Sequence, residues 1–502
     1  MPDIRKVLIA NRGEIAVRII RSCRDLNIAT VVVYSEPDET APHVILADES
    51  VFIGNAPSSE SYLVMEKIIE AARETGADAV HPGYGFLSEN AAFARLCQQN
   101  NLIFIGPSSD SIDIMGDKTR ARQTMDNAGV ASPPGTVDAL ESVEEAEKVA
   151  GEIGYPVLIK AAAGGGGKGM RIVHEKGDLK NSVTAAQSEA KNAFGDGRVY
   201  IEKYLESPRH VEFQIIGDHE GKIFHLFDRE CSIQRRHQKV IEEAPCSFLT
   251  PKLRADMANA AITVAKTCNY TNAGTVEFLV DKHNNFYFLE VNTRLQVEHP
   301  VTELVTGLDL VALQIQVAEQ KPLDIVQEDL QINGHAIECR ISAEDPAENF
   351  LPSTGKLNTH IIPSGPGIRV DSGVREGQEI SIHYDPLISK LITHGKDRKQ
   401  AIQRMDRALQ EYEIAGVKTT IPFCRYVMNH SAFTDSKYDT HFVGDHFAPS
   451  QLDLSEDDAE HEIAAIGAAL VMAVSDGSDG SHEQTTVAVN ESEWWSKRGK
   501  RN

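Results

Sequence analysis

TVEFLVDKHNNFYFLEVNTRLQVEHPVTE, residues 275–303, is the stretch that decides how the middle of this chain folds. Residues 275–280 and 286–292 both alternate like strands, and a polar turn separates them, so they predict a β-hairpin. A symmetric turn centred between His283 and Asn284 places Glu277 directly opposite Glu290. The alternation assigns a wholly apolar face to the core, comprising Val276, Phe278, Val280, Tyr287, Leu289 and Val291. The other face carries Thr275, Glu277, Leu279, Phe288, Glu290 and Asn292.

Two carboxylates opposite each other are the unusual feature of this hairpin. Like charges directly opposite destabilise a sheet. A hard cation with oxygen ligands would remove that repulsion, and Mg²⁺ held with phosphates suits one or two carboxylates plus an amide oxygen. Glu277, Glu290 and Asn292 are therefore candidate metal ligands. The alternative is a pair of ordinary surface glutamates on a half-exposed hairpin.

The composition is that of an acidic globular protein. At 502 residues the chain is long enough for about three domains. Its formal net charge of −24 argues against nucleic acid or an anionic membrane as the main partner. An anionic substrate must therefore meet positive charge inside a site. The seven cysteines are scattered without a CxxC pair, which indicates unpaired thiols in a reducing compartment.

No targeting or membrane segment is expected. The N-terminus, MPDIRKVLIANRG, leads directly into a strand and lacks a signal-peptide pattern. No apolar run approaches the roughly 20 residues that a membrane-spanning helix requires. Together with the cysteines, these features predict a cytoplasmic location and no membrane span.

The first region, 1–116, alternates strands and helices, which predicts an α/β fold class with a doubly wound parallel sheet. Strands are expected at KVLIA, TVVVYS, DAVHPG and IFIGPS, and helices over residues 14–26, 62–75 and 90–99. The first turn reads NRGE rather than GxGxxG, so no dinucleotide site is predicted there.

Two further regions and a tail follow. The second, 117–331, begins with a helix over 117–128 and contains a strand, glycine loop and strand, then a helix over 178–194. Its part near 132–204 has the character of a lid. The third, 332–447, mixes short strands with a helix over 398–412. The tail, 448–502, is acidic and predicted to be largely disordered, except for an apolar helix at 462–474 that packs on its own chain or docks on a partner.

The loop GGGGKG, residues 164–169, lacks the P-loop order because no GK[ST] is present. Consecutive glycines allow backbone N–H groups to approach a phosphate closely and allow the loop to hinge. Lys160 ends the strand just before this loop, so its ammonium would lie near any phosphate that the loop covers. A flexible linker and a solvated lysine are the alternatives.

A short basic stretch, RECSIQRRHQKVIEEAP at 229–245, stands out in an acidic chain. It supplies the local positive charge that an anionic substrate requires, or it is a surface patch that balances nearby acids. Beyond the hairpin, Arg294 could fork onto a planar oxyanion such as bicarbonate, and Glu298 is then available as a general base.

Taken together, these residues resemble biotin carboxylase, the ATP-grasp component of biotin-dependent carboxylases. The resemblance covers about residues 3–445 and is carried by LIANRGEIAVRI, HPGYGFLSEN, MGDK, KAAAGGGGKGM, EKYLESPRHVE, RECSIQRRHQKVIEEAP, EVNTRLQVEHPVTE, HAIECRISAEDP and YDPLISKLI. It implies an ATP-grasp fold with the N-terminal doubly wound domain at 1–116, the ATP-grasp domain at 117–331 and a C-terminal α+β domain at 332–447.

The resemblance also implies a role for each matching residue. The ATP contacts would be Lys118, Lys160, Gly165, Gly166, Glu202, Lys203, Leu205, His210, Gln234, His237 and Leu279. The bicarbonate and biotin contacts would be Tyr84, Gly85, Lys239, Arg294, Gln296, Val297 and Arg340. The metal ligands, for Mg²⁺ or Mn²⁺, would be Glu277, Glu290 and Asn292, and the catalytic residues Glu298, Arg340, Lys239 and Arg294.

The implied reaction has two stages. Bicarbonate, deprotonated by Glu298, attacks the γ-phosphate of ATP to give carboxyphosphate. Carboxyphosphate then gives CO₂ and phosphate, the phosphate takes the N1′ proton of biotin, and Arg340 stabilises the enolate oxygen. A closing lid would exclude water from carboxyphosphate.

The chain is expected to need partners. Biotin is attached in Ala-Met-Lys-Met in this family, and no Met here is followed by Lys, so the biotin carboxyl carrier protein and the carboxyltransferase would be separate subunits. A homodimer is the family expectation. The final acceptor, acetyl-CoA, propionyl-CoA or pyruvate, stays open. The competing interpretations are another ATP-grasp ligase and a non-catalytic subunit that binds nucleotide.

Overall fold

The computed structural model describes residues 2–136, 138–140, 142–162, 170–452 and 466–467. Residues from Met1 to Pro449 form one compact unit, and the chain beyond Pro449 is a separate unit. The predicted glycine-loop contacts Gly165 and Gly166 lie outside the described residues, and so does the predicted tail helix apart from Ile466 and Gly467. The division of the compact unit into three domains stays a prediction.

The N-terminal part is a five-stranded parallel sheet in the order β3-β2-β1-β4-β5, as the strand–helix alternation predicts. Its strands are β1 (Lys6–Ile9), β2 (Ala29–Ser35), β3 (Glu49–Gly54), β4 (Ala79–His81) and β5 (Ile103–Phe104). Its helices are α1 (Gly13–Asp25), α2 (Pro42–Leu46), α3 (Met65–Thr75), α4 (Ala91–Gln99) and α5 (Ser109–Gly116). The edge strand β3 and the short α2 were not predicted.

Both faces of this sheet are covered. Val7 and Ile9 pack with α1 and α11 (Leu310–Ala318), whereas Leu8 between them packs with α3 and α4 on the other face. This alternation is what a doubly wound sheet requires. The polar NRGE turn before α1 is left at the carboxyl edge of the sheet, where Arg12, Gly13 and Glu14 line a cavity.

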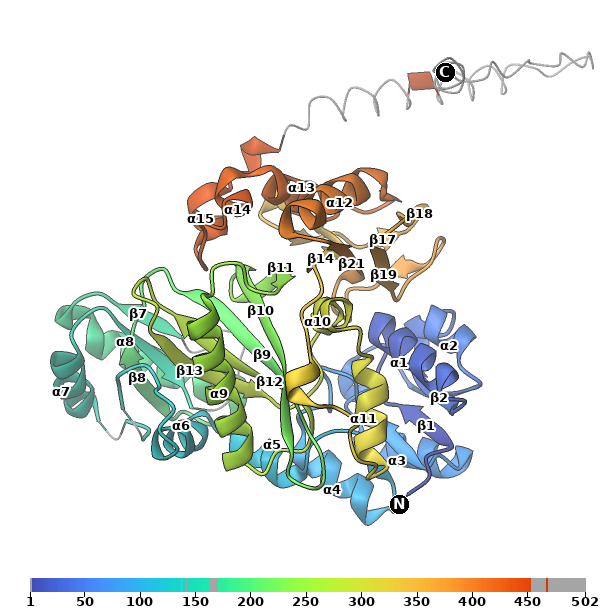
Figure 1. The fold of residues 1–502 in the computed structure, drawn as a ribbon, viewed down its shortest axis with the longest axis horizontal. Coiled ribbons are helices and arrows are strands. Elements are labelled where there is room, and N and C mark those ends of the chain that lie inside the picture. The colour runs from blue at the N-terminus through green and yellow to red at the C-terminus, as the bar shows by residue number, and fades with distance from the viewer. Residues whose placement is uncertain (1, 137, 141, 163–169, 453–465, 468–502) are drawn as a thin grey trace, which may run out of the picture. The chain divides into compact units, whose positions relative to one another are not determined.

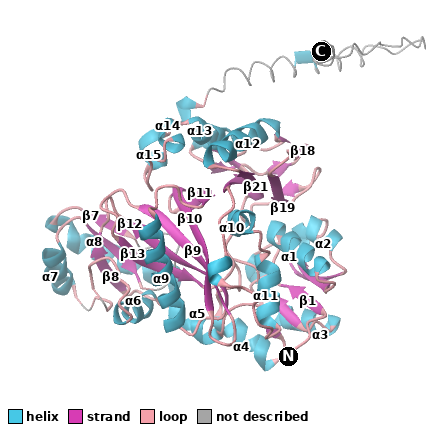
Figure 2. Cartoon of the chain, in the orientation of Figure 1, coloured by secondary structure: helices cyan, strands magenta, loops and turns pink. Residues whose placement is uncertain are grey.

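An eight-stranded antiparallel sheet, β13-β12-β9-β10-β11-β14-β21-β19, runs through the second and third sequence regions (Figures 1 and 2). Its strands are β9 (Arg209–Gly217), β10 (Ile223–Arg235), β11 (Gln238–Ala244), β12 (Asn272–Val280), β13 (Phe286–Asn292), β14 (His335–Ser342), β19 (Ile368–Ser372) and β21 (Leu387–Gly395). Helix α9 (Pro251–Thr267) packs on β9, β10 and β12. Helices α12 (Arg398–Glu411) and α13 (Ile421–Asn429) cover β14 and β21 through an apolar cluster.

A separate three-stranded sheet, β7-β6-β8, occupies the predicted lid region. It comprises β6 (Val157–Ala161), β7 (Arg171–Val173) and β8 (Val199–Lys203), with α7 (Val143–Ile153) and α8 (Lys176–Phe194) packed on it. The remaining helices of the compact unit are α6 (Lys118–Asn127), α10 (His299–Thr306), α14 (Ser431–Thr434) and α15 (Phe442–His446). Short strands complete the third region: β15 (Glu344–Asp345), β16 (Leu351–Pro352), β17 (Gly355–Lys356), β18 (Thr359–Ile361), β20 (Glu379–Ile380) and β22 (Glu413–Ala415).

The predicted hairpin forms, and Glu277 lies opposite Glu290 in its register. The assignment of side chains to its two faces was wrong at the outer end. A bulge between Glu277 and Phe278 shifts the pairing, so that Phe278 lies opposite Phe288. One extra residue in a strand reverses the face of everything beyond it. Phe288 is therefore buried in the core, while Leu289 faces the cavity.

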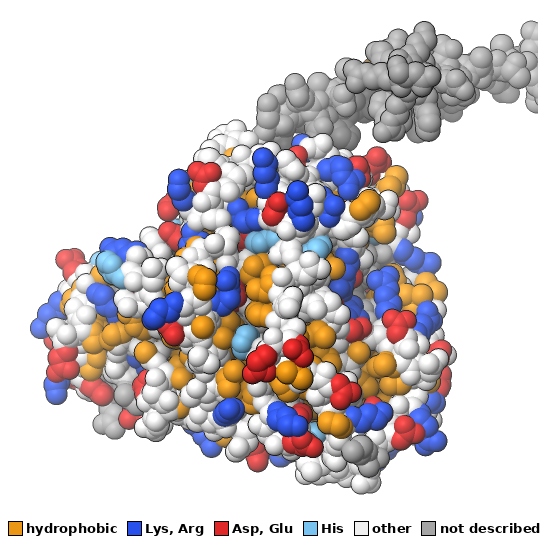
Figure 3. All heavy atoms as spheres, in the orientation of Figure 1, with side chains coloured by type: hydrophobic (Ala, Val, Ile, Leu, Met, Phe, Trp, Pro, Cys, Tyr) orange, Lys and Arg blue, Asp and Glu red, His pale blue; other side chains and the backbone are white. Residues whose placement is uncertain are grey.

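No single helix among the described residues is long and apolar enough to cross a membrane; only the bent pair α10 and α11 passes such a test together. On the face shown in Figure 3, acidic and basic side chains are interspersed over the described surface.

Candidate active site

The two opposed glutamates belong to a row of charged residues that crosses four strands on one face of the large sheet. Arg229 of β10 pairs in register with Glu212 of β9, Glu212 with Glu277 of β12, and Glu277 with Glu290 of β13. Glu212 is completely buried and Glu277 is 4% exposed. The alternative of two ordinary surface glutamates is therefore excluded for Glu277.

Arg229 compensates the innermost carboxylate of this row. Its Nε donates to Glu212 Oε1 at 2.5 Å, and its remaining nitrogens donate to Gln214, Thr275 and Thr302. The contact to Thr302 joins the sheet to α10, the helix that follows Glu298. The basic stretch at 229–245 is thus no surface patch at its first residue, because Arg229 is fully buried.

Replacing Arg229 with Met is expected to lower the free energy of unfolding by about 3–5 kcal/mol, because Glu212 would lose a buried partner. Chemical denaturation measures this change. The control is Arg5→Met, since Arg5 is exposed and its change should stay within about 0.5 kcal/mol. Equal stability of the two variants would contradict the inferred role of Arg229.

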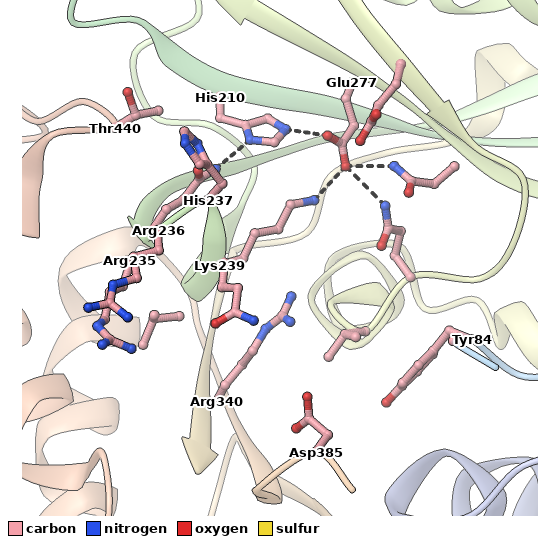
Figure 4. A pocket seen from close by; sticks show the side chains of 18 of the residues that line it. Tyr84, His210, Arg235, Arg236, His237, Lys239, Glu277, Arg340, Asp385 and Thr440 are labelled. Carbon is pink, nitrogen blue, oxygen red and sulfur yellow. Dashed lines mark hydrogen bonds and ion pairs between the residues drawn. The ribbon is translucent and has the colours of Figure 1, made fainter. Parts of the chain in front are cut away.

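Lys239 of β11 is the centre of the site. Its ammonium donates to Glu298 at 2.6 Å, to Glu277 at 2.8 Å and to Glu212 at 2.5 Å. Burial disfavours its charge, but these three carboxylates raise the pKa of Lys239 well above its ordinary value. Figure 4 shows the Lys239 ammonium pointing toward Glu277, with Arg340 nearby. One permanent positive charge therefore links all three acids.

Glu298 lies one contact behind the cavity wall. It is fully buried, and its carboxylate accepts hydrogen bonds from Lys239 and, at 3.0 Å, from Arg340. Burial opposes ionisation of Glu298, but Lys239 and Arg340 outweigh it and hold its pKa well below the ordinary range. Both cations line the cavity. An anion that binds them would weaken their hold on Glu298 and raise its basicity.

The oxygens of Glu277 are all engaged by neighbouring groups. Oε1 accepts from Lys239, from Asn292 at 2.8 Å and from Gln296 at 3.2 Å, and Oε2 contacts His210 Nε2 at 2.8 Å. Burial opposes its ionisation, yet Lys239 and His210 lower its pKa well below the ordinary value. An ionised carboxylate that already accepts several bonds is suited to a cation.

The donor set fits a hard divalent cation. Glu277, Glu290 and the Asn292 amide oxygen offer oxygen ligands from neighbouring strand positions, which suits Mg²⁺ or Mn²⁺. Glu290 is half-buried and forms an ion pair with Lys118 at 3.3 Å. The amide oxygen of Asn292 accepts a bond from Arg294 at 3.1 Å, so a metal ligand role requires this contact to open.

The side of the cavity near β6 and β8 has the character of a nucleotide pocket. Lys160 is ion-paired with Glu202, and Arg122 approaches the same carboxylate at 3.3 Å. Lys203 donates to the carbonyls of Gly154 and Tyr155, each at 3.0 Å. Apolar and basic residues of the same wall are Leu158, Met170, Ile172, Leu205, Leu279 and Leu289, with His210, Gln234 and His237 at the β10–β11 end.

The opposite end of the cavity is built from the loop after β13 and the N-terminal sheet. Arg294 is ion-paired with Glu89 at 2.8 Å and donates to Gln296 at 2.9 Å. The carbonyl of Val297 accepts from Lys390 at 2.8 Å, and Lys390 lies 5.8 Å from the ring of Tyr84. Figure 4 shows Tyr84 across the cavity from Lys239.

One cavity of about 1010 Å³ therefore holds nearly all the predicted site residues. Those that line it are Tyr84, Gly85, Lys118, Lys160, Glu202, Lys203, Leu205, His210, Gln234, His237, Lys239, Leu279, Glu277, Glu290, Asn292, Arg294, Gln296, Val297 and Arg340. Glu298 lies behind the wall, and Gly165 and Gly166 are not described.

Sequence reasoning missed Glu212, Glu242 and Glu89. Glu212 stands two positions after His210 on one strand, so the period of two would have placed both on the same face. Glu242 accepts from Arg340 and Glu89 from Arg294, across 98 and 205 residues of sequence, and no local signal predicts such pairs.

A nucleotide-sized cavity between two sheets, a strand-borne carboxylate pair and converging lysines define an ATP-grasp ligase. Family models match along the chain: biotin carboxylase N-terminal domain over 3–112, carbamoyl-phosphate synthase L chain ATP-binding domain over 117–326, and biotin carboxylase C-terminal domain over 338–445. The chain belongs to the biotin carboxylase family, the ligases that carboxylate biotin with ATP and bicarbonate.

Individual relatives agree. Biotin carboxylase 1 of Bacillus subtilis is 53% identical over 88% of this chain and 98% of its own length. A pyruvate carboxylase subunit from Methanothermobacter thermautotrophicus is also 53% identical, over 88% of this chain and 90% of its own. The biotin carboxylase domain dimer of Hydrogenobacter thermophilus 2-oxoglutarate carboxylase, solved with MgADP, ADP and bicarbonate, superposes with a TM-score of 0.87 at 48% identity, covering 90% of this chain and 99% of that one.

Proposed function

We propose that the residues of this cavity carry out both stages of biotin carboxylation. The observation that carries the proposal is the Lys239 contact set, in which one ammonium joins Glu277 at the metal end to Glu298 at the bicarbonate end. Lys118 and Lys160 would contact the ATP phosphates, and Glu202, Lys203 and Leu205 would line the adenine pocket. Glu277, Glu290 and Asn292 would hold Mg²⁺, which when bound neutralises charge on the phosphates.

At the other end, Lys239 and Arg294 would bind bicarbonate, with Gln296 and the Val297 backbone beside them. The anion would compete with Glu298 for Lys239, freeing the carboxylate to take the bicarbonate proton. Arg340 would then stabilise the negative oxygen that develops on biotin as its N1′ proton goes to phosphate. Tyr84 and Gly85 would contact biotin on the far wall.

The experiment measures ADP formation with ATP, Mg²⁺ and bicarbonate, with and without free biotin. The proposal expects a rate that depends on both bicarbonate and biotin, together with formation of carboxybiotin. ATP cleavage that requires ammonia or a purine substrate instead would favour another ATP-grasp ligase. Nucleotide binding without any cleavage would favour a non-catalytic subunit.

The chain would act as one subunit of an acetyl-CoA, propionyl-CoA or pyruvate carboxylase, with a separate biotin carboxyl carrier protein and a carboxyltransferase. The lack of a Met-Lys pair in the sequence supports a separate carrier, and the names of the relatives support several acceptors. A homodimer is supported by the dimer seen in the Hydrogenobacter relative. A cytoplasmic location is supported by seven cysteines that are all unpaired. Purification of the native complex identifies the transferase and hence the acceptor.

A further inference from the structure

Behind Arg340 the large sheet holds two more carboxyl groups that the proposed mechanism does not use. Glu242 of β11 and Glu338 of β14 are directly opposite each other in the antiparallel register. Both are completely buried, and neither lines the cavity. Their strand face is the one that carries Arg340 and Lys390, while Cys339 and Leu391 point to the other face and pack against α12. Like charges in such a position destabilise a sheet.

The hydrogen bonds of the two carboxyl groups are unequal. Glu242 Oε1 accepts from Arg340, with Nε at 2.7 Å and Nη2 at 2.5 Å. Glu242 Oε2 and both oxygens of Glu338 are buried without any hydrogen-bond partner in the described part of the chain. Buried polar atoms are rarely left unpaired, because each one costs its full desolvation energy. Three orphaned oxygens in one place therefore require an explanation.

The charges around the pair do not neutralise two anions. Glu338 is faced by Glu242 from β11, by Lys390 from β21, by Arg340 on its own strand, and by Glu298 and His299 at the start of α10. Arg340 is shared with Glu298, and Lys390 is committed to Glu14 at 3.2 Å and to the Val297 carbonyl. Lys239 and the Cys231 thiol approach from the β10 side, where Lys239 serves three other acids. Helix α12 contributes only apolar groups, Ala401, Met405 and Leu409.

The ionisation behaviour is consistent with this shortage of positive charge. Burial raises the pKa of Glu242 to about 7, although Arg340 opposes the shift. Burial also raises the pKa of Glu338 well above its ordinary value, with Lys390 opposing and Glu242 adding to the shift. Burial lowers the pKa of His299 well below its ordinary value, so this imidazole adds no positive charge.

We propose that Glu242 and Glu338 share one proton, with the O–H of Glu338 donating to Glu242 Oε2, and that this pair positions Arg340. Side chains directly opposite on a sheet have Cβ atoms about 4.5–5.5 Å apart, which allows two carboxyl groups to meet. The shared proton supplies a partner for the orphaned oxygens and leaves the pair with a single negative charge. Glu242 then holds the Nε edge of Arg340 while other N–H groups of the guanidinium face the cavity.

Loss of the shared proton would place two adjacent anions behind Arg340 and pull on its guanidinium. The binding of bicarbonate or biotin would then weaken, while ATP contacts at the other end of the cavity would not change. This consequence rests on the proposed substrate role of Arg340. The protonation of the pair itself does not, so the two can be tested separately.

The first test is independent of activity. Infrared spectra of the full-length wild type and Glu338→Gln at neutral pH should differ by the carbonyl band of a protonated carboxyl group, present only in the wild type. Glu338→Gln should fold with wild-type thermal stability at neutral pH, because a neutral amide replaces a neutral acid. As pH rises the wild type should lose stability relative to this variant, since a raised pKa in the folded state favours folding less when the proton is lost. An unchanged band, or a variant that fails to fold, overturns the proposal.

The second test measures kcat/KM for bicarbonate against pH. The wild type should lose activity on the alkaline side with a limb that Glu338→Gln lacks, because Gln cannot ionise. Glu338→Leu, which cannot donate, should lower kcat/KM for bicarbonate by about tenfold while KM for ATP stays the same. An alkaline limb retained in Glu338→Gln overturns the positioning role. If no variant or wild type shows bicarbonate-dependent turnover while the infrared difference is present, the proposed function fails and the proton-sharing pair stands.

Discussion

Glu298→Gln is expected to lower kcat for bicarbonate-dependent ATP cleavage by about 10²–10⁴-fold, the usual loss when a general base is removed. Glu298 is the one predicted catalytic residue behind the cavity wall, held by Lys239 and Arg340. The amide keeps the shape of the side chain and cannot take a proton. Steady-state measurement of ADP formation with free biotin, ATP, Mg²⁺ and bicarbonate gives the rate.

The pH dependence separates this role from simple positioning. Lys239 and Arg340 keep the pKa of Glu298 low in the resting site, so its acid limb should appear only in kcat, when bound bicarbonate competes for these cations. Glu328→Gln is the matched control, because Glu328 is an exposed glutamate and its change should leave the rate as it is. A rate for Glu298→Gln equal to that of this control would remove Glu298 from the mechanism.

Glu290→Lys should reduce ATP cleavage by about 10³-fold, because a bound metal contributes several kcal/mol and each 1.4 kcal/mol or so is tenfold in rate. The substitution removes a candidate ligand and places an ammonium beside Lys118, which already lies 3.3 Å from the Glu290 carboxylate. The fold should persist, since Glu290 is only half-buried. Turnover at saturating Mg²⁺ and the thermal midpoint are measured together.

Lys282→Glu tests whether any charge reversal on this hairpin has the same effect. Lys282 is exposed in the turn between β12 and β13, away from the carboxylate row, and its reversal should leave turnover intact. If Glu290→Lys retains turnover like this control, the metal assignment to Glu290 is wrong. Binding of Mn²⁺, followed by its magnetic resonance signal with ATP present, would show the loss directly.

The fold was predictable where neighbouring residues decide it. Helices α1, α4, α6, α8 and α12 begin and end within a few residues of their predicted limits. The edge strand β3 was missed because its pattern is half-exposed and its pairing with β2 comes from the sheet and not from its own sequence. The bulge near Glu277 was missed for the same reason: a bulge is set by how two strands meet.

The site was predictable where motifs carry it and unpredictable where burial decides. Arg235 and Arg236 were foreseen as local positive charge, and both line the cavity as side chains near its β10–β11 turn (Figure 4). Arg229, in the same stretch, is instead sealed inside the sheet against Glu212. The sequence alone does not distinguish an arginine that meets substrate from one that holds a buried acid.

By itself, the sequence determined the hairpin, the pairing of Glu277 with Glu290 and the family to which the chain belongs. The first two follow from a period of two and a short turn, which depend only on residues close in the chain. The tertiary structure alone decided that Lys239 reaches three acids, that Glu298 is buried behind two cations, and that Glu242 meets Glu338. Those contacts join β9, β11, β12, β14 and α10, and the order in which strands assemble is a property of the whole sheet. Charge and burial at each position therefore emerge only once distant strands lie side by side.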